Sequence, residues 1–400
     1  MISYEEALDL INKEFGKINL ATEDVELTES LNRIIAEDVF ADVDLPPFDN
    51  SAMDGYAIKF NPERSRNIIG EVSAGNFKEY IVGENDAVGI TTGSKIPEGS
   101  DTVIPVEDVS IENDILLFND NAKLKKGINV RLKGSDLLKG SITVNKFTMI
   151  NPSVIATLAS CGKDKVKVFR KLKAGILATG DELIPVSEKP SHDKIRASNN
   201  YALHAAFQSI NQEPVSYGFL NDDRNAIAEK VKTILDSDID IFVTTGGVSV
   251  GKYDFLKEVF EESGVKKIFW KINIKPGMPF YFGVYQTTDK PVLAFGLPGN
   301  PVSALVNFYI FIEPAIRKLL NQKEKEVYKA TLQDDIRKKD GKKHFSRGTI
   351  YNGTDGWEVK SHSSQSSGNY YELGNANCLI ITEAEIRNPK KGDVVKCILI

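Results

Sequence analysis

The chain has 400 residues, of which 41% are hydrophobic and 26% are charged, and these values are typical of globular proteins. The length exceeds that of one ordinary hydrophobic core, so we expect roughly two to four domains. The formal net charge of -6 argues against a nucleic-acid-binding surface, and no apolar run approaches the length of a membrane span.

The N-terminal residues, the cysteines and the histidines narrow the class of protein further. MISYEEALDLINKEFG carries acids early and has no apolar core, so it does not read as a signal peptide. The three cysteines, Cys161, Cys378 and Cys397, are far apart and lack metal-type spacing. The four histidines show no zinc spacing. We therefore expect a cytoplasmic protein with reduced, partly buried thiols and no zinc site.

Two helices are predicted near the N-terminus. Apolar residues recur at helical spacing over residues 3–16, with Ser3 as N-cap and Glu6 placed to complete a capping box. A second helix is predicted near residues 27–36, capped by Thr28 or Ser30. The segment DVDLPPFDNSAMDGYAIKF then ends the helical pattern, because its Pro-Pro pair and turn-forming residues oppose a helix.

β-rich segments are predicted in the first half of the chain and at its end. From about 68 to 148, short alternating runs separated by Gly, Asn and Asp predict an all-β insertion, sandwich- or barrel-like. Residues 152–159 return to a helix, which Gly162 ends. From about 328 to 400 the pattern is again strand-like and predicts a small terminal β-domain.

Strands and helices alternate from about residue 166. Strands are predicted at 174–178, in PVSYGFLNDD and in DIDIFVTTGG. Helices are predicted between them, in SNNYALHAAFQSI, capped by Ser198 or Asn199, and in DRNAIAEKVKTILDS. This order predicts a parallel sheet covered by helices, in which ligands bind beyond the carboxyl ends of the strands. The helix PVSALVNFYIFIEPAIRKLL closes the domain, with Pro301 in its first turn.

Glycine-rich turns follow two of the predicted strands, in IFVTTGGVSVGKYDF and in LAFGLPGNPVSA. Glycine lets the backbone approach an anion closely, and a helix N-terminus presents N–H groups to it. The two turns therefore predict a site for an anionic substrate. Two ordinary βα turns of an α/β domain would show the same pattern.

Acidic residues gather at the same predicted edge of the sheet. They are Asp181, Glu182, Asp222, Asp223 and Asp254. Carboxylate oxygens suit Mg²⁺, which takes one or two of them together with phosphate and water. Solvated loops and helix caps also place acids after strands, and Asp223 reads as the cap of the next helix. The set as a whole predicts a magnesium site.

Two lysines and a polar segment add to the candidate site. Lys271 and Lys275 would face the same side of one strand, because they are separated by a multiple of the strand period, and could bind an oxyanion or a phosphate. Two solvated lysines would show the same spacing. FDNSAMDGYA is either a structural corner or a loop that reaches a site across a dimer. Arg347 and Ser367 are weaker signals in the terminal domain.

Together these motifs resemble one family. PPFDNSAMDGYA, ITTGSKIPEG, LATGDEL, TTGGVSVGKYDF, FWKINIKPGMPF and GLPGNPVSA stand in the order found in the molybdopterin molybdenumtransferase family, called MoeA in bacteria and related to the gephyrin E-domain. The resemblance covers nearly the whole chain. It implies an enzyme that inserts molybdate into the dithiolene of adenylylated molybdopterin, releases AMP and uses Mg²⁺ or a similar divalent ion.

The resemblance also implies a fold class, multidomain α/β plus β, with four parts. These are a linker and dimerisation region at 1–42 and 138–165, an inserted β-domain at 43–137, a molybdopterin-binding, MogA-like α/β domain at 166–322 and a C-terminal β-barrel at 323–400. It implies an elongated homodimer, with each active site between the α/β domain of one subunit and the β-insertion of the other. The molybdopterin adenylyltransferase is the implied protein partner.

The site residues implied by the resemblance are carried over by motif. Asp54 and Thr92 would approach from the neighbouring subunit. Glu182, Asp222 and Asp254 would surround the metal and the pyrophosphate, with Asp222 and Asp254 as metal ligands. The other implied contacts are to phosphate, molybdate and the rest of the substrate. They comprise Gly246, Gly247 and Ser249 for phosphate, Lys271, Lys275, Arg347, Ser303 and Ser367 for molybdate or the terminal phosphate, and Ser198, Asn199, Pro298, Gly299, Asn300 and Pro301 for the substrate.

The chain departs from the family pattern at Met278, where many members have a second lysine in KPGKP. A methionine cannot pair with an oxyanion. Ala197 also stands where the family often has an Asp before Ser/Thr-Asn. Rival functions are a molybdopterin-binding scaffold without turnover, adenylylation of molybdopterin, and insertion of tungstate. The acids at the strand ends argue against a scaffold, and the extra β-domains favour the transferase.

Overall fold

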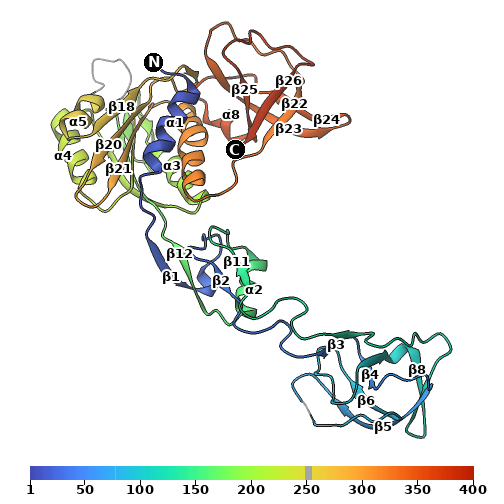
Figure 1. Ribbon diagram of the computed structural model, residues 1–400. Coiled ribbons are helices and arrows are strands. Elements are labelled where there is room, and N and C mark those ends of the chain that lie inside the picture. The colour runs from blue at the N-terminus through green and yellow to red at the C-terminus, as the bar shows by residue number, and fades with distance from the viewer. Residues whose placement is uncertain (77, 248–254) are drawn as a thin grey trace. The chain divides into compact units, whose positions relative to one another are not determined.

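The computed structural model describes residues 1–76, 78–247 and 255–400 (Figure 1). They form two compact units, one of residues 1–23, 32–34 and 168–400, and one of residues 24–31 and 35–167. The chain passes between the units in β1 (Thr22–Glu26) and β12 (Lys165–Phe169). No helix among the described residues combines the length and the apolar character needed to cross a membrane. The four-part division remains a proposal.

The smaller unit is built on a six-stranded sheet with the order β7-β4-β6-β5-β9-β8. Its strands are β4 (Gly55–Ile58), β5 (Ser65–Val72), β6 (Asp86–Ile90), β7 (Thr102–Pro105), β8 (Val109–Glu112) and β9 (Ile115–Phe118). Neighbouring residues face opposite sides, so Ala57 packs in one apolar core and Ile58 in another. The predicted β-insertion is confirmed, and its sheet begins at Gly55, earlier than expected.

Shorter elements complete this unit. β2 (Val39–Phe40) pairs with β11 (Ile142–Val144), and β3 (Asn50–Ser51) pairs with β10 (Val130–Arg131). The predicted helix near 152–159 is α2 (Pro152–Ser160), capped by Asn151.

The helix predicted near residues 27–36 is wrong. Only a short 3₁₀ turn forms there, η1 (Leu27–Glu29). Asn32 adopts a positive φ of 62°, which an α-helix does not accommodate. From Ile35 onward the backbone bonds to distant segments instead, beginning with the Ile35 N–H, which donates to the Thr148 carbonyl at 3.0 Å. Tertiary hydrogen bonds therefore override the local helical pattern.

The larger unit contains a second six-stranded sheet with the order β16-β13-β17-β21-β20-β18. The first four of these strands are parallel: β16 (Glu213–Leu220), β13 (Lys173–Thr179), β17 (Ile241–Thr245) and β21 (Pro291–Leu297). β20 (Tyr281–Gln286) and β18 (Lys266–Trp270) are antiparallel additions at one edge. The predicted parallel sheet is thus the larger part of a mixed sheet.

Helices cover this sheet (Figure 1). They are α1 (Tyr4–Phe15), α3 (Ser198–Ser209), α4 (Arg224–Leu235) and α5 (Leu256–Glu262). The predicted caps of α1 and α4 are confirmed, because Ser3 Oγ accepts the Glu6 N–H at 3.1 Å and Asp223 accepts two N–H groups of α4. The cap predicted for α3 is wrong. Ala197 is its N-cap and no side chain caps the helix.

One long helical run crosses residues 301–319. It consists of α6 (Pro301–Asn307), a π-helical turn at Phe308–Ile312 and α7 (Glu313–Leu319). Pro301 lies in the first turn, as predicted. Pro314 follows the π-helical turn closely; it has no N–H to donate, and a wider turn accommodates such a residue inside a helix.

A closed barrel forms the C-terminal part of the larger unit. Its strands are β22 (Val327–Leu332), β23 (Lys343–Gly353), β24 (Gly356–Ser361), β25 (Cys378–Thr382) and β26 (Val394–Leu399). Pairing of β23 with β25 closes the ring, and β19 (Ile274–Lys275) adds to β23 from outside. α8 (Tyr370–Gly374) lies between β24 and β25 in sequence. The three cysteines are free and fully buried, rather than partly buried as predicted.

Candidate active site at the sheet edge and the barrel

The carboxyl ends of three parallel strands meet at one edge of the sheet. β13 ends at Thr179, β17 at Thr245 and β21 at Leu297. A small cavity of about 40 Å³ lies at this edge. It is lined by five residues that the resemblance places in the site, namely Glu182, Ser198, Asn199, Gly299 and Pro301, together with the two threonines and their neighbours. These five positions therefore lie together in the structure.

Two threonines that line this cavity have unpaired hydroxyls. Thr179 Oγ1 and Thr245 Oγ1 are buried and make no hydrogen bond with any described residue. Leaving a buried hydroxyl unpaired costs free energy, so such groups call for an explanation, for example a bound ligand. Neither threonine was singled out from the sequence, although both lie in the motifs LATGDEL and TTGG.

The glycine turns are in close contact with each other. Gly246 and Gly247 have positive φ angles of 91° and 64°. A Cβ on Gly246 would lie 2.3 Å from the Thr179 carbonyl oxygen, and a Cβ on Gly299 would lie 3.5 Å from Gly246 Cα. The first turn therefore needs glycine at Gly246 both for conformation and for close approach, whereas a Cβ on Gly299 would make only an ordinary contact. Pro298 is buried behind them, and Asn300 is exposed as the N-cap of α6.

Asn199 ties the edge of the sheet to the barrel side of the unit. Its amide nitrogen donates to the Gly299 carbonyl at 2.8 Å, and its oxygen accepts from the Tyr370 hydroxyl. These bonds explain why Asn199 does not cap α3. Burial raises the pKa of Tyr370 to about 12, so the phenol stays protonated and keeps donating. Tyr370 is a member of this edge that no sequence pattern indicated.

The acids of the edge lie on adjoining loops. The Asp222 N–H donates to Asp181 Oδ1 at 3.0 Å, so the loops after β13 and β16 are in contact. The Glu182 carboxylate folds back over Gly180, where a Cβ would lie 2.6 Å from its Oε2. Within the described ranges no three His, Cys, Asp or Glu side chains are grouped closely enough to hold a metal. Asp254 and Ser249 lie outside the described residues.

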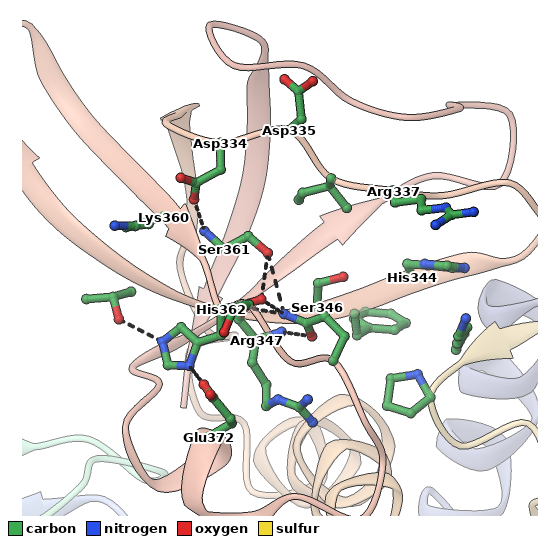
Figure 2. A pocket seen from close by; sticks show the side chains of 17 residues that line it. Asp334, Asp335, Arg337, His344, Ser346, Arg347, Lys360, Ser361, His362 and Glu372 are labelled. Atoms are coloured by element: carbon green, nitrogen blue, oxygen red, sulfur yellow. Dashed lines mark hydrogen bonds and ion pairs between the residues drawn. The ribbon is translucent and has the colours of Figure 1, made fainter.

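A second, larger cavity of about 770 Å³ lies along the barrel (Figure 2). Lys275 and Arg347, both carried over from the resemblance, line it together with His344, His362 and Glu372. Arg347 is on β23 and only 1% exposed. Its Nη2 donates to the Ser364 carbonyl at 2.6 Å, and its Nε is buried without a hydrogen-bond partner among the described residues. A buried, incompletely paired guanidinium is suited to an oxyanion.

Burial lowers the pKa of Arg347, and the Glu372 carboxylate opposes that shift. Arginine remains protonated in proteins under such conditions. Arg347 and the exposed Lys275 therefore both bring positive charge to the cavity, which Arg337 and Lys360 also line.

Lys271 and Lys275 do not share a strand, so that prediction is wrong. Lys271 follows the end of β18 with a positive φ of 69°, and its Nζ lies 4.0 Å from the Trp270 ring centroid. Lys275 lies on β19, in register with His344 of the barrel. The backbone turns between the two lysines, which removes the strand period on which the prediction rested. Beside Met278, Lys342 places its Nζ 3.3 Å from the thioether sulfur.

The remaining predicted residues are placed as follows. Ser303 is 3% exposed within α6. The Ser367 carbonyl accepts the Val302 N–H at 3.1 Å, so this loop residue reaches the start of α6. In the smaller unit, Asp54 and Thr92 contact each other, because the Asp54 carboxylate accepts from the Thr92 N–H at 2.6 Å and from its hydroxyl at 2.7 Å.

Comparison with known proteins identifies the family. Three family models match the chain. Residues 2–162 match the MoeA N-terminal region (domain I and II), and residues 329–400 match the MoeA C-terminal region (domain IV). Residues 175–318 between them match the family described as "Probable molybdopterin binding domain". A molybdopterin molybdenumtransferase of Haemophilus influenzae is 37% identical over 382 residues, covering 94% of this chain and 93% of the relative. The chain belongs to the molybdopterin molybdenumtransferase family. It is an enzyme of molybdenum-cofactor biosynthesis.

Further members of this family agree in sequence and in fold. The molybdopterin molybdenumtransferase of Staphylococcus epidermidis is 32% identical over 412 residues, covering all of this chain and 95% of the relative. The crystal structure of the molybdopterin biosynthesis moeA protein from Pyrococcus horikoshii OT3 is 30% identical, covers 100% of both chains and has a TM-score of 0.84. The fold class implied by the sequence, multidomain α/β plus β with a C-terminal barrel, is confirmed.

Proposed function

We propose that this transferase inserts molybdate into the dithiolene of adenylylated molybdopterin and releases AMP. Two cavities support the proposal. One lies at the glycine turns and the acidic edge of the sheet, and the other contains Lys275 and Arg347. The observation that carries it is the buried guanidinium of Arg347, whose Nε has no partner within the described structure. A tetrahedral oxyanion such as molybdate would supply acceptors for it.

The chemistry proposed follows from charge. Molybdate and the pyrophosphate of the adenylylated pterin are both anions and repel each other. Lys275 and Arg347 would bind the oxyanion, while backbone N–H groups at Gly246, Gly247 and the start of α6 would face the phosphates. Holding both anions in a fixed orientation lowers the barrier to their reaction. Ser198, Asn199 and the two threonine hydroxyls would contact the rest of the substrate.

Mg²⁺ is part of this proposal. The donor set at the sheet edge fits it, because Glu182 and Asp222 offer carboxylate oxygens close to the phosphate-binding turns, and Mg²⁺ takes few protein ligands beside phosphate and water. Asp222 and Asp254 are the proposed metal ligands. When bound, the ion would supply charge neutralisation at the phosphates and polarise the P–O bond that breaks.

A homodimer is also proposed. The smaller unit exposes large apolar side chains outside its sheet cores. They are Phe40, Met53, Leu132, Leu138, Ile142 and Met149, each at least 40% exposed. Exposed apolar side chains of this size would contribute to such an interface. Asp54 and Thr92 would then reach the site of the neighbouring subunit. The free, buried cysteines support a cytoplasmic location, where the molybdopterin adenylyltransferase would deliver the substrate.

Turnover distinguishes this proposal from a scaffold. Purified protein is mixed with adenylylated molybdopterin, Mg²⁺ and molybdate, and AMP is measured by chromatography. AMP release that depends on molybdate supports the transferase. Its absence would leave a molybdopterin-binding scaffold as the function. The same assay with tungstate tests whether the enzyme prefers that ion. Asp254→Asn should abolish AMP release while the dimer stays intact, and full activity of this variant would exclude the assigned metal ligand.

A further inference from the structure

One imidazole joins the two elements that flank the serine-rich loop 362–369. His362 Nε2 lies 3.0 Å from Thr349 Oγ1, and His362 Nδ1 lies 2.8 Å from Glu372 Oε2 (Figure 2). Thr349 belongs to β23 and Glu372 to α8. His362 therefore links a barrel strand to the helix at the far end of the loop.

Two contacts of His362 hold the ring. Nε2 and the Thr349 hydroxyl form a hydrogen bond. Nδ1 lies within ion-pair distance of the Glu372 carboxylate but forms no hydrogen bond with any described residue. The His362 and Glu372 side chains are 12% and 21% exposed, so water competes weakly for these contacts. The two contacts fix the orientation of the ring.

The loop anchored in this way holds Arg347. The Gln365 side chain accepts the Arg347 N–H at 2.9 Å and donates to the Arg347 carbonyl at 2.9 Å. The His362 N–H donates to the same carbonyl at 3.0 Å, and Ser364 supplies the carbonyl that accepts from the guanidinium. The loop thus positions both the backbone and the charged group of Arg347.

The loop continues from the barrel to the edge of the α/β sheet. Its Ser367 carbonyl accepts the Val302 N–H at the start of α6, and Tyr370 just beyond it donates to Asn199. Residues 362–370 therefore connect the cavity of Arg347 with the cavity of Asn199. If this loop lost its fixed conformation, the side chains of the two cavities would no longer be held in place relative to each other.

We propose that His362 is a positioning residue for the oxyanion end of the site. By joining Thr349 to Glu372 it fixes loop 362–369, and through that loop the guanidinium of Arg347, without touching the oxyanion itself. This inference rests on the function proposed above. Arg347 would recognise a tetrahedral dianion, and both molybdate and a terminal phosphate have this form. The experiment distinguishes between these two ligands.

The test compares two substitutions in the full-length protein. His362→Phe keeps the bulk of the ring and removes both the hydrogen bond to Thr349 and the contact with Glu372. His362→Asn keeps a donor close to the position of Nδ1 and so preserves the contact with Glu372. The matched control is Tyr371→Phe, one residue from Glu372 and 79% exposed. Calorimetric titration with molybdate, and separately with inorganic phosphate, measures the Kd without requiring turnover.

We expect His362→Phe to raise the Kd for the oxyanion about tenfold, His362→Asn to fall between it and the natural protein, and the control to stay within about twofold. In turnover, the KM for molybdate should rise in parallel while kcat and the KM for adenylylated molybdopterin change less than about twofold. An effect on phosphate alone supports the positioning role and assigns the oxyanion as phosphate. An unchanged Kd in His362→Phe overturns the inference.

Magnetic resonance of ¹⁵N-labelled histidine gives a second readout that does not depend on the variants' stability. The chain has four histidines, and the signal lost in His362→Asn assigns His362. The natural protein should show a proton on Nδ1, which lies 2.8 Å from the Glu372 carboxylate, whereas protonation at Nε2 alone overturns the inference. Failure of the proposed function looks different. The natural protein would then bind an oxyanion, respond to His362→Phe, and release no AMP.

Discussion

The carboxylate of Asp54 accepts two hydrogen bonds from one residue, Thr92, through its backbone N–H and its hydroxyl. These bonds, the backbone one foremost, lower the pKa of Asp54. The group is therefore charged at every pH above its ordinary value of 3.8, and its bonds weaken only when pH falls through the lower, folded value. Thr92 thus helps to keep Asp54 negatively charged at the surface of the smaller unit.

Asp54→Asn should lower AMP release at least about tenfold, because an amide can accept the same two bonds but carries no charge. Folding should be unaffected, since the side chain is exposed. Activity and the melting temperature are measured together, between pH 6 and 8, where the ionisation of Asp54 adds no pH dependence. Asp108→Asn, another acid of the smaller unit, serves as the control. Equal activity in Asp54→Asn and the control would exclude Asp54 from the site.

Gly246→Ala should lower the free energy of unfolding by straining the turn that follows β17. The added Cβ would meet the Thr179 carbonyl oxygen at 2.3 Å, in a backbone conformation that already disfavours alanine. Gly218→Ala is the matched control, because Gly218 has a φ of 75° and open space around its Cβ position. Urea denaturation should show a loss of roughly 1–3 kcal/mol beyond that of the control. Equal losses of unfolding free energy in the two variants would show that the contact between residue 246 and the Thr179 carbonyl does not affect stability.

Asp240→Asn should reduce stability by about 3 kcal/mol, because it leaves the buried end of an ion-pair network uncompensated. Asp240 is 1% exposed and lies 2.7 Å from Arg170 and 3.0 Å from Lys290. Burial acts to raise its pKa, but the bonds from Arg170, the Lys173 N–H and Lys290 outweigh it and lower the pKa of Asp240.

The sign of the pH effect follows from that shift. The stabilisation from Asp240 is fully present above the ordinary value of 3.8 and is lost as pH falls through the lower, folded value. The stability difference between the natural protein and Asp240→Asn should therefore shrink in acid. Denaturation curves at pH 7 and near pH 3 check this, and a difference that grows in acid would contradict it.

Arg347→Lys should raise the KM for molybdate about tenfold while leaving the proposed dimer intact. Lysine keeps the charge but has no planar fork for an oxyanion, and its ammonium is harder to bury. Lys360→Gln removes a charge that lines the same cavity from β24 and is the matched control. Steady-state kinetics with varied molybdate measure both. If Lys360→Gln has the larger effect, the oxyanion is bound elsewhere in the cavity.

Leu138→Asp should weaken the proposed dimer at least about tenfold, because it places a charge in an apolar contact surface. Leu138 is 61% exposed in the smaller unit. Ile386→Asp, at a side chain 47% exposed in the larger unit, is the control. Light scattering across a dilution series gives the mass. A natural protein that is monomeric throughout would contradict the dimer itself.

Local sequence rules predicted the features that depend on local physics. The caps at Ser3 and Asp223, the first turn at Pro301 and the gathering of strand ends at one edge each follow from neighbouring residues and were confirmed. The helix predicted near residues 27–36 failed because Asn32 and the bond to Thr148 outweigh the apolar spacing there.

The site itself depends on contacts between distant residues, which local rules do not reach. Lys271 and Lys275 looked like neighbours on one strand, yet Lys275 pairs with a barrel strand far along the chain. The hydrogen bond between Asn199 and Tyr370 and the contact between His362 and Glu372 likewise correspond to no periodic pattern in the sequence. Motif resemblance supplied several of these positions, and packing explains why they belong together.

Gln365 has a consequence for how this enzyme can be altered. Its amide occupies the hydrogen-bonding positions that a neighbouring strand would otherwise use on Arg347, while β23 and β25 close the barrel independently. Within the described structure, no residue of loop 362–369 takes part in the strand pairings that close the barrel. Substitutions in this loop should therefore change how the anion is held while the ring of strands stays intact.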